Sequence, residues 1–193
     1  PELFNTGYEY HERNYGVAEP IDGQTVTWMK TKAAQYNIHL AGTLLLRDGQ
    51  DIFNAAILTA PDGRHWRYDK QYVPFWERAY FRNGDHITIA DTAIGRFGMM
   101  ICWDQSHPNL WEQYAGQVDA IIIMSCPGDL STSELVFPDG FRTGFFDLVG
   151  RPPESSATEP ESDGYHKHAA WMGVPLVESA ATGKIRTRLP MIK

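Results

Sequence analysis

Only two cysteines, Cys102 and Cys126, occur among the 193 residues, and this scarcity excludes a framework of several disulfides, although one bridge stays open. Long uncharged apolar runs are also absent, so we expect no membrane span. Lys and Arg number 17 against 24 Asp and Glu and are scattered singly, so the basic surface that nucleic acid requires is missing. We therefore expect neither a membrane nor a nucleic-acid partner.

The first residues lack a basic segment followed by an apolar one, so no targeting signal can be read there. Together with the few cysteines, this favours a reduced, cytoplasmic setting. With 42% hydrophobic and 21% charged residues, the composition is that of a globular protein. We interpret residues 1–193 as a single domain.

Apolar runs and turn signals predict an α/β protein. An antiparallel meander is indicated by three apolar runs separated by Asp48-Gly49 and Asp62-Gly63, which are typical of tight turns. A later strand, turn, helix and strand follow the order of a right-handed crossover. The predicted helices are 24–35, 109–115 and 165–172, and the predicted strands are 38–46, 51–60, 64–68, 87–93, 96–103, 119–125 and 174–180.

Residues 127–164 break this pattern because they are rich in Pro, Ser and acidic residues. A long irregular connection inside a domain is usually a lid or a binding loop. We predict a flexible lid or a substrate-facing insertion there.

Cys102 is the most suggestive single residue, because it lies where an apolar strand gives way to a turn and a helix. Ligand chemistry in α/β sheets gathers at the carboxyl ends of strands, and amides at a helix start can meet a developing oxyanion. On position alone, an inert buried thiol is the stronger interpretation for Cys102, as it is for Cys126.

Three blocks of sequence, taken together, resemble the carbon–nitrogen hydrolase (nitrilase) superfamily. The blocks are Pro1-Glu2-Leu3-Phe4-Asn5-Thr6-Gly7-Tyr8, Tyr68-Asp69-Lys70-Gln71-Tyr72-Val73-Pro74-Phe75-Trp76-Glu77 and Gly98-Met99-Met100-Ile101-Cys102-Trp103-Asp104. Residues 169–183 resemble the late helix and strand of that family.

The resemblance implies a Glu-Lys-Cys triad made of Glu2, Lys70 and Cys102. Glu2 would act as the base, which requires burial to raise its pKa, and Lys70 would stabilise the oxyanion together with the backbone N–H of Trp103. Glu77 matches a supporting glutamate beside the lysine; its alternative interpretation is an ion pair with Arg78 or Arg82.

The implied function is hydrolysis of a non-peptide C–N bond in a small amide or N-carbamoyl substrate through a cysteine thioester, without a cofactor or metal. Asp104 after Trp103 resembles the amidase side of the superfamily. The alternatives are a nitrilase or acyltransferase with the same triad, or a catalytically silent binding or assembly member. His107, His166 and His168 lack the spacing of metal ligands and are interpreted as surface residues.

The resemblance also implies a four-layer α-β-β-α sandwich and at least a homodimer. The family's domain is longer at both ends, so we expect the sequence to be incomplete there. Only Pro1 precedes Glu2, and the sequence shows no element that would hold this base in place.

Overall fold

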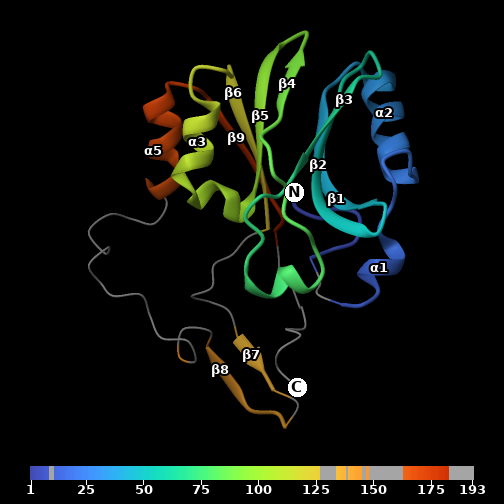
Figure 1. The fold of residues 1–193 in the computed structure, drawn as a ribbon, viewed down its shortest axis with the longest axis vertical. Helices are drawn as coiled ribbons and strands as arrows, with labels where there is room; N and C mark the ends of the chain where they lie inside the picture. Colours follow the sequence, from blue (N-terminus) through green and yellow to red (C-terminus); the bar gives the residue numbers. More distant parts are fainter. Residues whose placement is uncertain (9–10, 127–133, 138, 145–146, 148–162, 183–193) are drawn as a thin grey trace.

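Two β-sheets lie face to face in the computed structural model, with helices on the outer side of each (Figure 1). The structure describes residues 1–8, 11–126, 134–137, 139–144, 147 and 163–182. Helix α2 (Gln24–Tyr36) covers one sheet, and helices α3 (Pro108–Tyr114) and α5 (Asp163–Met172) cover the other. The predicted α/β class and its four layers are confirmed.

The first sheet is the predicted antiparallel meander. Its order is β1-β2-β3, with β1 (Leu40–Asp48), β2 (Asp51–Thr59) and β3 (His65–Asp69). Asp48 pairs with Asp51, and Gly49 between them has a φ of 59°. Glycine adopts this left-handed conformation without steric cost, which explains why the turn falls there.

The second sheet has the order β4-β5-β6-β9, with β4 (Ile89–Thr92), β5 (Gly95–Ile101), β6 (Ala120–Ser125) and β9 (Leu176–Ala180). Strands β4 and β5 pair antiparallel, whereas β5, β6 and β9 are parallel. The connection from β5 to β6 runs through the 3-10 helix η2 (Cys102–Ser106) and α3, as a crossover requires.

One strand boundary differs from the prediction. The strand expected over 96–103 ends at Ile101, because Cys102 has a φ of 46° and so leaves the β region. Two short helices also occur where the sequence predicted neither a helix nor a strand: α1 (Asn14–Val17) and the 3-10 helix η1 (Phe75–Ala79).

A small hairpin lies within the segment that was expected to be irregular. Strands β7 (Glu134–Val136) and β8 (Arg142–Gly144) pair antiparallel. Asp139 accepts a hydrogen bond from the Phe141 N–H at 2.9 Å, a turn contact that the local pattern did not reveal. Most of residues 127–164, and with them the predicted lid or insertion, lie outside the described residues.

Apolar side chains fill all three interfaces between the layers. Helix α2 packs Val26 and Met29 on the outer face of the first sheet. The sheets meet through Ala56, Leu58, Tyr68, Ala90, Met99, Ile101 and Met124. Trp111 and Tyr114 of α3 pack on the outer face of the second sheet with Ala169 of α5. Among the described residues, no helix is long and apolar enough to cross a membrane.

Gly84 fixes the backbone that follows β3. Its N–H donates to the Lys70 carbonyl at 2.8 Å, and a Cβ added at Gly84 would lie 2.2 Å from the Asp69 carbonyl oxygen. Real atoms do not approach so closely, so a side chain here must displace the segment that carries Lys70.

We predict that Gly84→Ala lowers the free energy of unfolding by about 1–3 kcal/mol in urea denaturation, because overpacking displaces backbone. Gly16→Ala is the control, since a Cβ there meets no atom within 4 Å. Equal stability of the two variants would contradict the prediction.

Candidate active site

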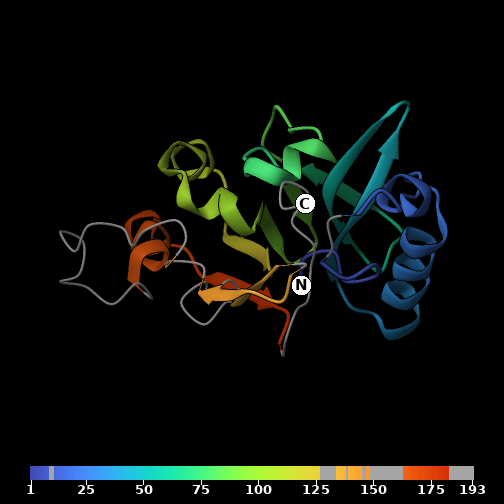
Figure 2. The ribbon, with the colours of Figure 1, turned by 90° about the horizontal axis from the view of Figure 1, so that it is seen from below.

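The N-terminus of the chain lies between the two sheets (Figure 2), and Glu2, the second residue, is buried. The Glu2 N–H donates to the Ser125 carbonyl at the end of β6 at 3.1 Å, and the Leu3 N–H donates to the Thr43 hydroxyl of β1 at 2.7 Å. Only 2% of Glu2 is exposed. Strands β6 and β1, which are distant from Glu2 in the chain, thus hold it in place. The sequence did not show these contacts.

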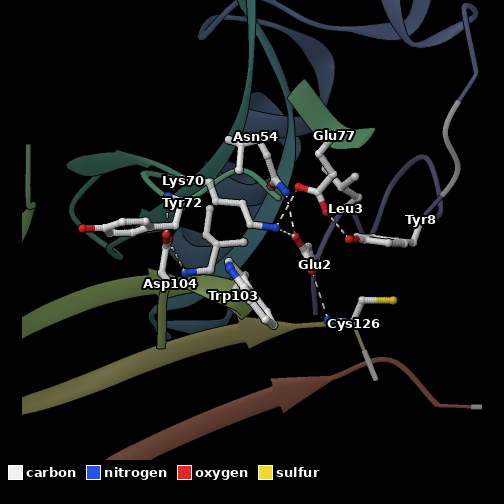
Figure 3. Close-up of polar contacts among 12 residues, drawn as sticks. Glu2, Leu3, Tyr8, Asn54, Lys70, Tyr72, Glu77, Trp103, Asp104 and Cys126 are labelled. Carbon is white, nitrogen blue, oxygen red and sulfur yellow. Dashed lines mark hydrogen bonds and ion pairs between the residues drawn. The ribbon is translucent and has the colours of Figure 1, made fainter. Parts of the chain in front are cut away.

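Lys70 lies directly after β3 and joins two carboxylates. Its Nζ donates to Glu2 Oε1 and to Glu77 Oε2, both at 2.9 Å, and all three side chains are fully buried (Figure 3). Glu77 therefore pairs with Lys70. The alternative, an ion pair of Glu77 with Arg78 or Arg82, is wrong. Arg78 donates to the Val73 carbonyl, and Arg82 pairs with Asp51.

Two further side chains contact this cluster, and neither was among the residues predicted from the sequence. Asn54 of β2 donates from Nδ2 to Glu2 Oε1 at 2.7 Å, and the Tyr8 hydroxyl donates to Glu77 Oε1 (Figure 3). A polar amide inside the apolar run of β2 was the available signal for Asn54. For Tyr8, no local pattern distinguishes it from a surface tyrosine.

The charges of the cluster do not balance, since two carboxylates share one ammonium. Burial raises the pKa of Glu2; Lys70 opposes this rise and Glu77 adds to it. Burial acts to lower the pKa of Lys70, but Glu2 and Glu77 outweigh it and hold that pKa well above its usual value. Lys70 is thus a permanent cation, and Glu2 can exchange a proton nearer neutral pH than an exposed glutamate.

Cys102 begins η2 at the carboxyl end of β5. Its φ of 46° is unusual for a residue with a side chain, and such strain costs about 1–3 kcal/mol unless neighbouring contacts enforce it. The residue is half-buried, so part of its surface stays accessible. A sharp turn that presents a thiol at a strand end is what a nucleophile needs.

The thiol of Cys102 belongs to the same electrostatic environment as the cluster. Burial raises the pKa of Cys102 well above its usual value, Glu2 adds to the rise, and Lys70 opposes it. The resting group is therefore a neutral thiol. Glu2 also contacts the end of the neighbouring strand β6, where its Oε2 accepts a hydrogen bond from the Cys126 N–H at 3.2 Å.

Cys126 is a buried free cysteine at the end of β6. Burial, with Glu2 and Glu77, raises its pKa to about 12, which keeps the thiol protonated. This agrees with its interpretation as a small buried side chain.

Asp104 holds the turn after Cys102 in place. Its carboxylate accepts hydrogen bonds from the Tyr68 hydroxyl at 2.8 Å, the Tyr72 N–H at 2.8 Å and the Ile101 N–H at 3.1 Å. Three bonds from two segments join the end of β5 to the segment that carries Lys70. Asp104 is fully buried, so its contacts are structural.

Other candidates lie at the edge of this region. Trp103 follows Cys102, with 45% of the residue exposed, and His107 stacks on Tyr72. In the part of the chain that the structure describes, no three His, Cys, Asp or Glu side chains are grouped as metal ligands. A surface hollow of about 670 Å³ is lined by residues that include Tyr15, Asp51 and Arg82, and it contains none of Glu2, Lys70 and Cys102.

A fully buried Glu-Lys-Glu cluster thus lies in an α-β-β-α sandwich and acts electrostatically on the thiol of Cys102. A family profile described as carbon-nitrogen hydrolase matches residues 1–148. The chain belongs to the carbon–nitrogen hydrolase family.

Individual relatives agree with this family. A nitrilase of Pyrococcus abyssi is 30% identical over 112 residues, which are 56% of this chain and 43% of that protein. The omega-amidase YafV of Escherichia coli is 25% identical over 134 residues, 68% of this chain and 51% of that protein. The chain thus spans about half the length of the curated relatives it matches.

A solved structure has a similar fold over most of this chain. Saccharomyces cerevisiae Nit3, a member of the nitrilase superfamily, superposes with a TM-score of 0.68 at 23% identity and covers 94% of this chain and 61% of Nit3.

We predict that Lys70→Met lowers the free energy of unfolding by about 3–5 kcal/mol at neutral pH, because two buried carboxylates lose their cation. The loss should shrink as the pH falls, since Glu2, whose pKa is raised by burial, can then take up a proton.

Glu2→Gln is the matched variant, because it keeps the Lys70–Glu77 pair and removes one buried charge. Its cost should stay below about 2 kcal/mol in the same urea denaturation series. A Lys70→Met protein as stable as Glu2→Gln would contradict the electrostatic account.

Proposed function

We propose that the chain carries the catalytic centre of a thiol hydrolase that cleaves the C–N bond of a small amide or N-carbamoyl substrate. Cys102 is the nucleophile, Glu2 the general base and Lys70 the cation at the oxyanion. The observation that carries the proposal is the buried Glu2–Lys70–Glu77 cluster beside a strained, half-buried Cys102.

In the first half of the reaction, Glu2 takes the proton of the Cys102 thiol while the sulfur attacks the substrate carbonyl carbon. Because the pKa of the thiol is raised, proton transfer must accompany attack. The tetrahedral intermediate then collapses, the C–N bond breaks, and Glu2 returns the proton to the leaving ammonia or amine. The product on the enzyme is a thioester of Cys102.

In the second half, Glu2 removes a proton from water as the water oxygen attacks the thioester carbonyl. The second tetrahedral intermediate expels the sulfur, which recovers its proton from Glu2, and the acid leaves. Glu2 thus exchanges one proton in each half, which its raised pKa favours.

Lys70 has three N–H donors, of which Glu2 and Glu77 each receive one. The third is available for the oxyanion, together with the backbone N–H of Trp103 at the start of η2. Glu77, in turn held by Tyr8, is a supporting residue that fixes the position of the ammonium.

Two observations bear on the substrate class: the residue that follows Trp103 and the names of the relatives. Asp104 resembles the amidase side of the superfamily, but its buried contacts to Tyr68, Tyr72 and Ile101 make it part of the scaffold. The relatives include proteins named nitrilase and omega-amidase, so hydrolysis of a nitrile is the alternative. A panel of short amides, N-carbamoyl compounds and nitriles, assayed for ammonia release, distinguishes them.

We predict that Cys102→Ala abolishes ammonia release, whereas Cys126→Ala keeps most of it. Iodoacetamide should label Cys102 faster than Cys126 in peptide mass mapping, because Cys102 is the more accessible thiol. Full activity of Cys102→Ala would overturn the proposed function.

We also predict that kcat/KM falls as the pH drops through the pKa of Glu2, because the base must be ionised. Since burial raises this pKa, the acidic limb should lie above about 4.3, the ordinary value for glutamate. A limb at or below that value, measured with an uncharged amide, would remove Glu2 from the role of base.

A further inference from the structure

Asn54 makes contacts to both partners of the Glu2–Lys70 pair. Its Nδ2 donates to Glu2 Oε1 at 2.7 Å, and its backbone carbonyl accepts the Lys70 N–H at 3.0 Å. It lies in β2 just before Ala55, which pairs with Asp69 of β3, so it is the strand neighbour of Lys70. One residue therefore fixes the side chain of the base and the backbone of the lysine.

The two oxygens of Glu2 have different surroundings. Oε1 accepts from Lys70 at 2.9 Å and from Asn54 at 2.7 Å, so both of its lone pairs are used. Among the described residues, Oε2 accepts only the longer bond from the Cys126 N–H, at 3.2 Å, which leaves it a lone pair. This division leaves Oε2 as the oxygen that can receive a proton.

The buried amide of Asn54 has an unfavourable effect on the stability of the fold. The side chain is fully buried, and its Oδ1 has no hydrogen-bond partner among the described residues. A buried, unsatisfied acceptor is unfavourable, and an apolar residue of similar size would avoid it. The contact that this side chain makes in the site is therefore the hydrogen bond from its Nδ2 to Glu2.

An amide is the donor that suits the charge of this cluster. The two carboxylates already outnumber the single ammonium, and an aspartate at position 54 would add a third negative charge. Asn54 supplies a hydrogen bond to Glu2 without changing the charge.

We propose that Asn54 is a positioning residue of the base: with Lys70 it occupies Oε1 of Glu2 and so directs proton transfer to Oε2. This inference rests on the proposed function, in which Glu2 exchanges a proton with Cys102. Asn54 acts through Glu2 and does not contact the reacting atoms.

The test measures the rate at which iodoacetamide alkylates Cys102 as the pH is varied, followed by peptide mass mapping. This readout needs no turnover. The titratable groups around Glu2 belong to Pro1, Lys70, Glu77, Cys102 and Cys126, none of them at position 54. Substitution of Asn54 thus leaves every one of these groups present.

In Asn54→Leu, which is close in size and lacks the donor, we expect the acidic limb of the alkylation profile to move up by about one pH unit. Loss of one hydrogen bond to a charged group implies a shift of this order. We expect kcat/KM for amide hydrolysis to fall by about ten- to a hundredfold, mostly through kcat, because the base is misplaced.

Thr59→Val is the matched control, since Thr59 is also buried in β2 but its hydroxyl donates to the Leu40 carbonyl, away from Glu2. It should keep the wild-type acidic limb.

Glu2→Gln should abolish the acidic limb, and this result would assign the limb to Glu2. If Asn54→Leu does not fold, Asn54→Asp replaces it, and the added carboxylate should also move the limb upward.

An unchanged limb in the folded Asn54 variant, or a limb that persists in Glu2→Gln, overturns the role of Asn54. Absence of hydrolysis by the wild-type protein, with a shifted alkylation limb in Asn54→Leu, overturns the proposed function and keeps the Asn54–Glu2 coupling. The two failures are therefore distinguishable.

Discussion

The buried ion pairs of Lys70 are the interaction on which this site depends. One ammonium lies between Glu2 and Glu77 with no exposure to water, so the charges must satisfy one another. The two carboxylates keep Lys70 charged, and burial, with a further contribution from Glu77 and against the effect of Lys70, raises the pKa of Glu2. The same desolvated contact thus produces a permanent cation and a carboxyl group with a raised pKa.

The scaffold holds this cluster by joining the ends of strands from both sheets. Lys70 follows β3 of one sheet, whereas Cys102 and Cys126 follow β5 and β6 of the other. Asp104 links the two sides through hydrogen bonds to Tyr68, Tyr72 and Ile101. These bonds support the left-handed conformation of Cys102, which would otherwise be unfavourable.

Most strands were predictable from the sequence because their signals are local. Apolar runs and the Asp48-Gly49 turn placed β1 and β2 within two residues of their observed bounds. The end of β5 lies two residues before its predicted position, because the conformation of Cys102 is imposed by its tertiary contacts. The β7–β8 hairpin was missed because its strands are too short to show a period.

The sequence by itself determined the α/β class and, through its resemblance to one family, the candidates Glu2, Lys70, Glu77 and Cys102. Only the tertiary structure decided their partners: Glu77 pairs with Lys70 instead of a neighbouring arginine, and Asn54 joins Glu2 across 52 positions of the chain. The physical reason is that burial and pairing depend on which strand ends meet, and local sequence carries no information on that contact.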